Sequence, residues 1–326
     1  MRHLSVFLLS LIFITGCSRQ TDFTYNEGNI FGTWYHFKYD HPTGKDLHQE
    51  ILQLLDEFDQ SLSTYNPDSL ISRSNRNDPL VELDELFLVC FNRAQEISAD
   101  TDGAFDITVG PLVNAWGFGS GEKRELTPEL IAELQGISGY RKVRVEGTRL
   151  IKDNPEIQLD VNAVAKGYAV DVVGQFLIAE GCEHFMVEIG GEVVTRGRNP
   201  DNVPWRIGIN KPIDDPSSAQ QELHTVVSLN DVGMATSGNY RNFYIKDGVK
   251  YAHTIDPRTG YPVQHSLLSA TVLAPDCMTA DAYATAFMVM GLEQSVALVD
   301  KRDELEALFI YSDENGDHQS WQSEGF

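Results

Sequence analysis

The stretch LDVNAVAKGYAVDVVGQFLIAEG, residues 159–181, joins a strand-like run to a long helix whose apolar residues recur with the helical period. In the simplest interpretation, Asp160 or Asn162 caps the start of this helix. However, Lys166 and Gly167 fall in its first turn, where an acid is more usual than a cation. Because backbone N–H groups at a helix start are unpaired, a cation beside them also indicates a binding site for an anion.

The segments on either side predict a mixed α/β (α+β) fold. Periodicity and caps predict helices over residues 47–63, 86–98, 127–136 and 278–299. Strand-like runs cover residues 142–147, 156–161, 184–197, 205–210, 225–230, 242–256, 267–274 and 307–321. This order is not a regular βαβ alternation, and no linker-like stretch divides it. We therefore expect a single domain over residues 30–326, with antiparallel sheets and packed helices.

The composition excludes some classes of function. The 326 residues carry a formal net charge of -23. Such a surface repels phosphate backbones, so no nucleic acid partner is expected, and an anionic ligand would need a local device such as a metal ion or a helix start. Cys90, Cys182 and Cys277 lack the spacing of a metal site or a disulfide framework, and we expect the first two to be core residues.

The N-terminus predicts export and lipidation. Residues 1–16 hold a basic residue and an apolar run too short to span a bilayer comfortably, which is the form of a signal peptide. Residues 14–17, ITGC, resemble the lipobox of bacterial lipoproteins, in which Cys17 would be lipidated. Residues 17–29 would then form a lipidated tether, with the domain outside the cytoplasm; Ser18 favours the outer membrane if the cell has one. The alternative is an ordinary signal peptide with an incidental cysteine.

Asp281 and Thr285 are four residues apart in the helix predicted near the C-terminus, so they share one helix face. A carboxylate and a hydroxyl one turn apart offer two hard oxygens, which suit Mg²⁺. The alternative is structural, in which Asp281 caps the helix and Thr285 bonds back to a backbone carbonyl.

Other stretches combine glycine with aromatic residues. Residues 103–119, GAFDITVGPLVNAWGFG, surround Asp106 and form either a loop packed on the core or a platform for a flat ring. Residues 63–75 resemble a surface turn. At residues 189–193, IGGEV, and 235–240, ATSGNY, glycine turns would let the backbone approach a ligand closely.

Taken in order, the motifs resemble the ApbE family of bacterial FAD:protein FMN transferases. Those that carry the resemblance are GTWYHF, STYNPDS, GAFDITVGPLVNAWGFG, LDVNAVAKGYAVD, IGGEV, TSGNY, HTIDPRTGYPV and ADAYATAFMVMG, from Gly32 to Gly291. The resemblance implies an ApbE/T-fold-like catalytic domain that cleaves FAD as substrate. It would need Mg²⁺ and would transfer FMN to a Thr/Ser hydroxyl of a partner, releasing AMP. The partners would be flavin-acceptor subunits resembling those of Na⁺-translocating NADH:quinone reductase or Rnf complexes.

The resemblance also implies site residues. The Mg²⁺ ligands would be the Ala163 backbone carbonyl, the Asp281 carboxylate and the Thr285 hydroxyl. The FAD contacts would be Phe31, Tyr65, Ala104, Phe105, Asp106, Asp160, Lys166 and the backbone near Thr254. Three positions depart from the family pattern: Phe31 replaces the usual Met, Asn239 a frequent Asp, and Ala284 an acid that some relatives carry. Because of the departure at Ala284, the sequence leaves open whether the protein holds one metal ion or two.

Residues 253–263, HTIDPRTGYPV, gather a histidine, an acid and a base at a proline–glycine turn. Cleaving a diphosphate by in-line attack needs charge neutralised on the phosphoryl oxygens, which Mg²⁺ would supply with Lys166 and Arg258 assisting. The partner supplies the nucleophile, so His253 is the candidate proton acceptor. The turn at Asp256 would hold His253 and Arg258 beside the diphosphate. The alternative is a plain turn in which His253 only orients backbone.

Two rival functions stay open at this point. A Mg²⁺-dependent FAD pyrophosphatase would use the same site, with water in place of the partner's hydroxyl. A passive flavin-binding lipoprotein would store or deliver FAD without cleaving it. Loss of the metal ligands would favour the passive protein, whereas Asp281 and Thr285 are both present.

The lipobox leads to a test of location. Cys17→Ser should abolish lipidation, and the protein should then move from the membrane fraction to the soluble fraction. Membrane fractionation with radiolabelled fatty acid measures both effects. Unchanged processing and fractionation of the variant would show that Cys17 is not an anchor.

Overall fold

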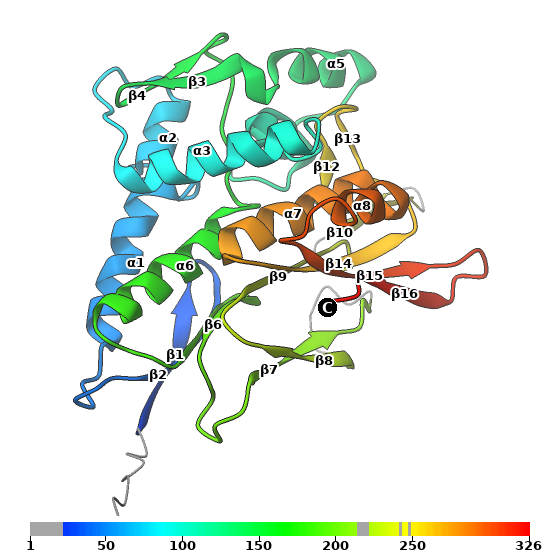
Figure 1. Ribbon diagram of the computed structural model, residues 1–326. Helices are drawn as coiled ribbons and strands as arrows, with labels where there is room; N and C mark the ends of the chain where they lie inside the picture. Colours follow the sequence, from blue (N-terminus) through cyan, green and yellow to red (C-terminus); the bar gives the residue numbers. More distant parts are fainter. Residues whose placement is uncertain (1–21, 214–221, 241–242, 247–248) are drawn as a thin grey trace, which may run out of the picture.

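The computed structural model describes residues 22–213, 222–240, 243–246 and 249–326, and an eight-stranded sheet lies at its centre (Figure 1). The strand order is β1-β2-β5-β6-β9-β14-β15-β16, and neighbouring strands run antiparallel. These strands are β1 (Phe23–Ile30), β2 (Thr33–Asp40), β5 (Phe185–Ile189), β6 (Glu192–Arg196), β9 (Gly233–Gly238), β14 (Leu267–Ala274), β15 (Glu306–Ser312) and β16 (His318–Gln322). The predicted mixed α/β fold with antiparallel sheets is confirmed.

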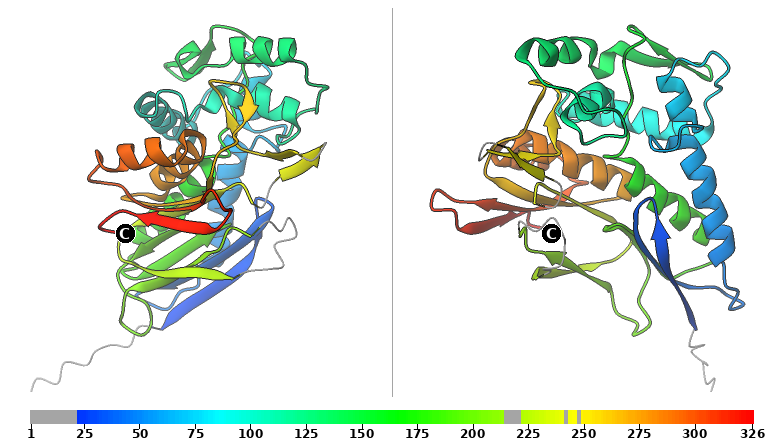
Figure 2. Two further views of the ribbon diagram at one scale, coloured as in Figure 1. Left: turned by 90° about the vertical axis from the view of Figure 1, so that its right-hand side faces the viewer. Right: turned by 180° about the vertical axis from the view of Figure 1, so that it is seen from behind.

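Helices cover one face of the sheet, and a two-stranded ribbon covers the other (Figures 1 and 2). On the sheet lie α6 (Ala165–Ala179), α7 (Cys277–Met290) and α8 (Leu292–Val299), while α1 (His48–Leu62) packs against α6, and α3 (Glu85–Asp100) packs against α1 and α7. The ribbon consists of β7 (Trp205–Asn210) and β8 (Leu223–Leu229). The main apolar core therefore lies between the helices and the sheet, and a smaller core lies under the ribbon.

The remaining elements form a layer beyond the helices (Figure 1). They are α2 (Leu70–Asn75), α4 (Gly110–Trp116), α5 (Pro128–Ile137), the 3₁₀ turns Ile107–Val109 and Tyr140–Lys142, and the hairpins β3 (Val143–Glu146)–β4 (Arg149–Lys152), β10 (Phe243–Lys246)–β11 (Val249–Ala252) and β12 (Ile255–Asp256)–β13 (Tyr261–Pro262). A third apolar cluster joins α4, α5 and β12 through Leu112, Trp116, Ile131 and Ile255. This cluster fixes the 253–263 turn to the glycine-rich segment at residues 103–119.

The helices α6 and α7 meet at a point where only glycine fits. A Cβ atom on Gly167 would lie 2.3 Å from the carbonyl oxygen of Cys277 and 2.8 Å from Cβ of Asp281. The Gly167 N–H donates to Asp281 Oδ2 over 3.0 Å. One turn further along α6, Asp171 accepts from the backbone N–H groups of Cys277 (2.9 Å) and Met278 (2.8 Å). The first turns of both helices are thus joined through backbone groups.

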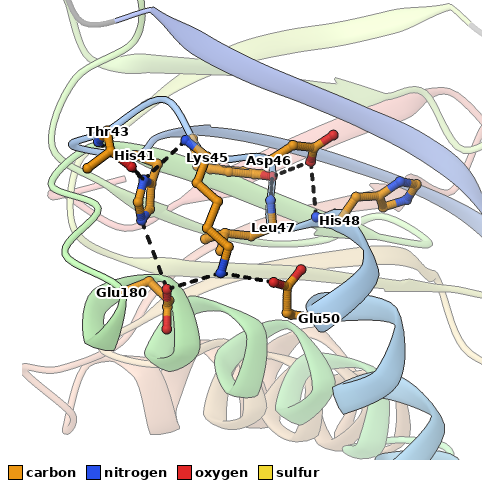
Figure 3. A network of polar contacts seen from close by, with 9 residues as sticks. His41, Thr43, Lys45, Asp46, Leu47, His48, Glu50 and Glu180 are labelled. Carbon is orange, nitrogen blue, oxygen red and sulfur yellow. Dashed lines mark hydrogen bonds and ion pairs between the residues drawn. The ribbon is translucent and has the colours of Figure 1, made fainter.

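A polar network ties the connection between β2 and α1 to the end of α6 (Figure 3). Lys45 Nζ lies 2.9 Å from Glu50 and 3.9 Å from Glu180, and His41 Nε2 lies 3.9 Å from the same Glu180 carboxylate. Asp46 accepts from the His48 N–H over 3.0 Å. Because Lys45 and Glu50 are exposed, we expect each ion pair to contribute little to stability. The network mainly fixes the path of the loop that leads into α1.

Most predicted elements are confirmed, and three are wrong. Residues 156–161 do not form a strand, because the Asn75 side chain bonds both the N–H (2.7 Å) and the carbonyl (2.9 Å) of Leu159 in place of a neighbouring strand. The expected surface turn at 63–75 ends in α2, which Ser69 caps by accepting from the Ser72 N–H. The glycine-rich stretch at 103–119 is not a plain loop, since it contains α4.

The predicted tether is also too long. β1 begins at Phe23 and pairs with β2 along its whole length, so residues 23–29 belong to the sheet and the described domain begins seven residues before 30. The predicted signal peptide and Cys17 lie outside the described residues. In the part of the chain that the structure describes, no helix combines the length and apolar character needed to cross a bilayer. The predicted core positions of Cys90 and Cys182 are confirmed.

The crossing of α6 and α7 predicts that alanine changes stability in opposite directions at two helical glycines. Gly167→Ala should lower the free energy of unfolding by about 1–3 kcal/mol, because its Cβ would overlap backbone that cannot move alone. Gly136→Ala in α5 is the matched control: nothing lies within 4 Å of its Cβ position. There alanine should stabilise the helix by about 0.5–1 kcal/mol. Urea denaturation measures both values, and equal effects would contradict the crossing.

Candidate functional site

A cavity of about 810 Å³ lies where these elements converge. Its walls come from the β1–β2 turn, the end of α1, the 104–118 segment, the start of α6, the β5–β6 turn, β9, the 253–257 segment and α7. The cavity brings together the predicted residues Phe31, Tyr65, Ala104, Phe105, Asp106, Asp160, Ala163, Lys166, His253, Thr254, Asp281 and Thr285. Arg258 is the exception among the predicted residues, because it does not line this cavity.

Three oxygen donors lie together on the helix side of the cavity. Asp281 is buried in the second turn of α7, while Asp276 caps that helix by accepting from the Thr279 N–H over 2.7 Å. The Thr285 hydroxyl lies 3.0 Å from the Ser237 hydroxyl rather than on a backbone carbonyl. The structural alternatives for Asp281 and Thr285 are therefore wrong.

The donor set has the chemistry of a site for a hard cation. Ala163, Asp281 and Thr285 all line this cavity, and they carry a backbone carbonyl, a carboxylate and a hydroxyl. The described residues include no group of three or more His, Cys, Asp or Glu side chains placed to hold a metal ion. Binding of a cation here would thus draw on neutral oxygens as well as on one carboxylate.

Lys166 stands in the first turn of α6 and is held by a residue that the sequence analysis missed. Its Nζ lies 2.7 Å from Oε1 of Glu192, whose side chain is 5% exposed. Burial alone would lower the pKa of Lys166, but the carboxylates of Glu192 and Asp281 raise it above its ordinary value. Burial raises the pKa of Glu192 to about 7, against the effect of Lys166. The signal for Glu192 in the sequence is an acid directly after two glycines, at the start of a strand whose next two residues are apolar.

The start of α6 is not capped by a side chain. Val164 occupies the cap position and makes no side-chain hydrogen bond there, so the interpretation of Asp160 or Asn162 as a simple cap is wrong. Asp160 instead accepts from the Asn162 N–H over 2.9 Å, and its own N–H donates to the Ile107 carbonyl over 2.7 Å. Three N–H groups here are already paired, since Val164 and Ala165 donate to the Val161 carbonyl and Gly167 donates to Asp281. The α6 start therefore acts on an anion mainly through Lys166 and the helix dipole.

Asp106 uses its carboxylate to build the wall. Oδ1 accepts from both the N–H and the hydroxyl of Thr108, each over 2.7 Å, and Oδ2 accepts from the Tyr140 N–H over 2.7 Å. Burial raises the pKa of Asp106 above its ordinary value, although these hydrogen bonds oppose the shift. The side chain thus joins the 104–108 segment to residue 140.

Aromatic residues form the opposite side of the cavity. Phe31 occupies the β1–β2 turn with a φ of 51°, a left-handed conformation that a bulky residue seldom adopts. Its ring centroid lies 6.0 Å from that of Phe58. Tyr65 is 64% exposed at the rim. Backbone strain of this kind is found at ligand sites, and these rings offer a surface for a flat ligand.

The 253–263 turn is fixed by Asp256. Its carboxylate accepts from the Arg258 N–H over 2.9 Å and from the guanidinium over 2.9 and 3.1 Å. The guanidinium of Arg258 is therefore directed to Asp256, and the structure does not bring it into the cavity. His253 does line the cavity, with its ring 6.5 Å from that of Phe118. The Thr254 hydroxyl donates to the Asn239 side chain over 2.7 Å, a contact that the family's Asp could also accept.

Comparison with known proteins agrees with this geometry. The profile of the ApbE family matches residues 31–309. The chain is 40% identical over 325 residues to the FAD:protein FMN transferase of Vibrio cholerae serotype O1, spanning 97% of this chain and 96% of that protein. The chain is also 36% identical over 338 residues to the FAD:protein FMN transferase of Escherichia coli K12, and the match spans 98% of this chain and 95% of that protein.

The chain belongs to the ApbE family. The solved flavin transferase ApbE from Vibrio cholerae superposes with a TM-score of 0.84 at 38% identity, covering 94% of this chain and 98% of that one. The ApbE protein from Thermotoga maritima gives a TM-score of 0.81 at 29% identity, with 94% and 98% covered. The predicted family and ApbE-like fold are thus confirmed, and as an ApbE family member the chain is an enzyme of the transferase class.

The hydrogen bonds of Asp106 predict a structural cost of its substitution. Asp106→Asn places an amide N–H₂ against one of the donors on Thr108 or Tyr140, so the free energy of unfolding should fall by about 1–3 kcal/mol. Asp102→Asn is the control, since Asp102 is exposed and its left-handed φ of 49° suits asparagine. The control should change stability by less than about 0.5 kcal/mol in urea denaturation. Equal stability of the two variants would show that Asp106 does not hold the wall.

Proposed function

We propose that this transferase cleaves FAD and attaches FMN, through a phosphoester bond, to a threonine or serine hydroxyl of a partner protein. The diphosphate P–O bond breaks, a new P–O bond forms to the partner's oxygen, AMP leaves, and the hydroxyl proton passes to a base. The observation that carries the proposal is the cavity, which joins an aromatic wall, a lysine at a helix start and three hard oxygen donors. A flavin ring, a diphosphate and a divalent cation are the chemical complements of these parts.

Mg²⁺ is the proposed cofactor. Asp281, Thr285 and the Ala163 carbonyl would hold it, and a set made only of oxygen donors fits its ligand preference. When bound, the ion would neutralise charge on the phosphoryl oxygens. Ala284 supplies no further oxygen from its side chain, so we propose one ion held by the protein.

The chain's own residues would orient the substrate. Lys166 would bind the diphosphate oxygens beside the N–H groups at the start of α6. Phe31 and Tyr65 would pack against the rings of FAD, and Asp160 would accept hydrogen bonds from it. His253 would take the proton from the partner's hydroxyl, because it lines the cavity and a histidine titrates near working pH. Arg258 would act on the diphosphate only if it left Asp256, so we assign it the turn rather than the chemistry.

We also propose that a lipid on Cys17 anchors the enzyme to a bacterial membrane, with the domain outside the cytoplasm. β1 begins at Phe23, six residues after Cys17 (23 − 17), so a fully extended linker would reach about 20 Å. Acceptors would be exposed on the same side of the membrane. The proposed acceptors, flavin subunits resembling those of Na⁺-translocating NADH:quinone reductase or Rnf complexes, would have to meet that condition.

One incubation separates this function from its rivals. The protein is mixed with FAD, Mg²⁺ and a candidate flavin subunit, and covalent flavin is read as fluorescence on a denaturing gel. The proposal expects a fluorescent subunit and AMP in equal amounts. FMN and AMP without labelled protein would indicate a pyrophosphatase, and intact FAD would indicate a passive binding protein. Asp281→Ala is the inactive control and should lose transfer by orders of magnitude, whereas Thr285→Val should be milder, because water can replace a neutral ligand.

The proposed role of His253 predicts that its substitution lowers the rate of transfer without weakening FAD binding. If it takes the hydroxyl proton, His253→Ala should slow transfer by roughly 10²–10⁴-fold. FAD affinity should barely change, because the contact forms only in the transition state. The parent's rate should rise with pH as the base loses its proton, and that dependence should vanish in the variant. Calorimetric titration of FAD and a pH–rate profile measure both; weakened binding with an unaltered profile would leave His253 a support of the turn.

A further inference from the structure

Glu192 occupies a position that is costly for a carboxylate. It is the first residue of β6, directly after the turn at Gly190 and Gly191, and it lines the cavity while only 4% exposed. Burial removes water from a charged group, which costs several kcal/mol unless that group is paired. Apolar residues of similar volume often give equal or greater stability than a buried ion pair. The presence of Glu192 therefore indicates a role beyond folding.

The contacts of Glu192 are one-sided. Oε1 holds the Lys166 ammonium at 2.7 Å, whereas Oε2 is buried and has no hydrogen-bond partner among the described residues. The Gly191 N–H in the preceding turn donates to Glu188 over 2.7 Å rather than to Glu192. Among the described residues, Lys166 is the side-chain partner of Glu192.

Asp281 is a second acidic side chain to which the Lys166 ammonium could bond. Lys166 directly precedes Gly167, whose N–H donates to Asp281 over 3.0 Å, and Lys166 and Asp281 line the same cavity. A lysine side chain is long and flexible, and 35% of this one is exposed, so packing alone does not fix its end. If the ammonium turned to Asp281, it would occupy oxygens that the proposed function assigns to the metal.

We propose that Glu192 is a positioning residue for the reaction: it holds Lys166 Nζ on its own side of the cavity, so that the ammonium meets the diphosphate and stays off Asp281. The inference rests on the proposed function, because it concerns the same diphosphate. It adds to that function a residue outside the ligand set and explains why an acid follows the Gly190-Gly191 turn.

A double-mutant cycle tests the inference. The variants are Glu192→Gln, which keeps the shape and removes the charge, Lys166→Met, and the pair combined. Glu192→Gln should slow FMN transfer by about tenfold or more, the range for loss of a hydrogen bond to a charged group. In the Lys166→Met background the same change should alter transfer less than about twofold, because Glu192 acts only through the lysine. If the losses of transfer rate caused by Glu192→Gln and Lys166→Met multiplied in the combined variant, the proposal would be overturned.

Two controls exclude a general effect on the turn. Glu188→Gln changes the neighbouring acid that holds the Gly191 N–H but does not line the cavity, and it should leave transfer unchanged. Glu192→Met made together with Lys166→Met replaces the whole ion pair by apolar side chains and should unfold at the parent's urea midpoint or higher. If both Glu192 variants lost stability along with activity, the residue would be structural and the proposal wrong.

Binding of FAD without metal gives a readout that does not depend on transfer. Fluorescence titration should show weaker FAD binding in Glu192→Gln and no further loss when Lys166 is already Met. Should the parent bind FAD yet label no acceptor, the proposed function would fall while this titration still decided the Glu192–Lys166 coupling. Equal FAD affinities of parent and Glu192→Gln, together with equal transfer rates, would overturn the positioning role.

Discussion

The backbone contact between Gly167 and α7 is the constraint on which the site depends. The absence of a side chain at Gly167 lets the start of α6 approach the carbonyl of Cys277. This approach puts the Gly167 N–H within hydrogen-bonding distance of Asp281. Lys166 precedes it by one residue and is therefore carried to the same place. A lysine and a carboxylate from segments more than a hundred residues apart thus share one cavity because two helices touch without side chains between them.

Three of the acids that line the cavity are committed to separate contacts, which matters for the proposed anionic substrate in a protein of net charge -23. Asp106 is committed to Thr108 and Tyr140, Glu192 to Lys166, and Asp281 in part to the Gly167 N–H. Lys166 is the only lysine or arginine among the described residues that line the cavity. One cation cannot balance a diphosphate among these acids, so the proposed divalent cation, held by the oxygens around Asp281, would be the remaining means of attracting it.

The sequence allowed the fold and most of the site to be predicted, and the errors have a common physical origin. Helical periods and hairpin turns depend on neighbouring residues, so they were read correctly over α1, α3, α5 and β14–β16. Residues 156–161 alternate like a strand, but the partner that satisfies Leu159 is the side chain of Asn75, eighty-four positions away. Glu192 was missed for the same reason, because its partner Lys166 lies in another segment of the chain. Arg258 is a different case, because its partner Asp256 is only two residues away and the guanidinium turns to this neighbour instead of into the cavity.

The strained turn at Phe31 links the site to the proposed anchor. β1 leads from the proposed tether directly to this turn, and its eight residues span about 26 Å at the usual rise per residue. With an extended linker of about 20 Å, the cavity would work within roughly 45 Å of the membrane surface. An acceptor hydroxyl would then have to lie on a segment exposed at that height, and it would have to be mobile enough to enter past Tyr65. This geometry would favour acceptors held on the same membrane over soluble proteins, because the proposed anchor would raise the local concentration only of partners that stay within its reach.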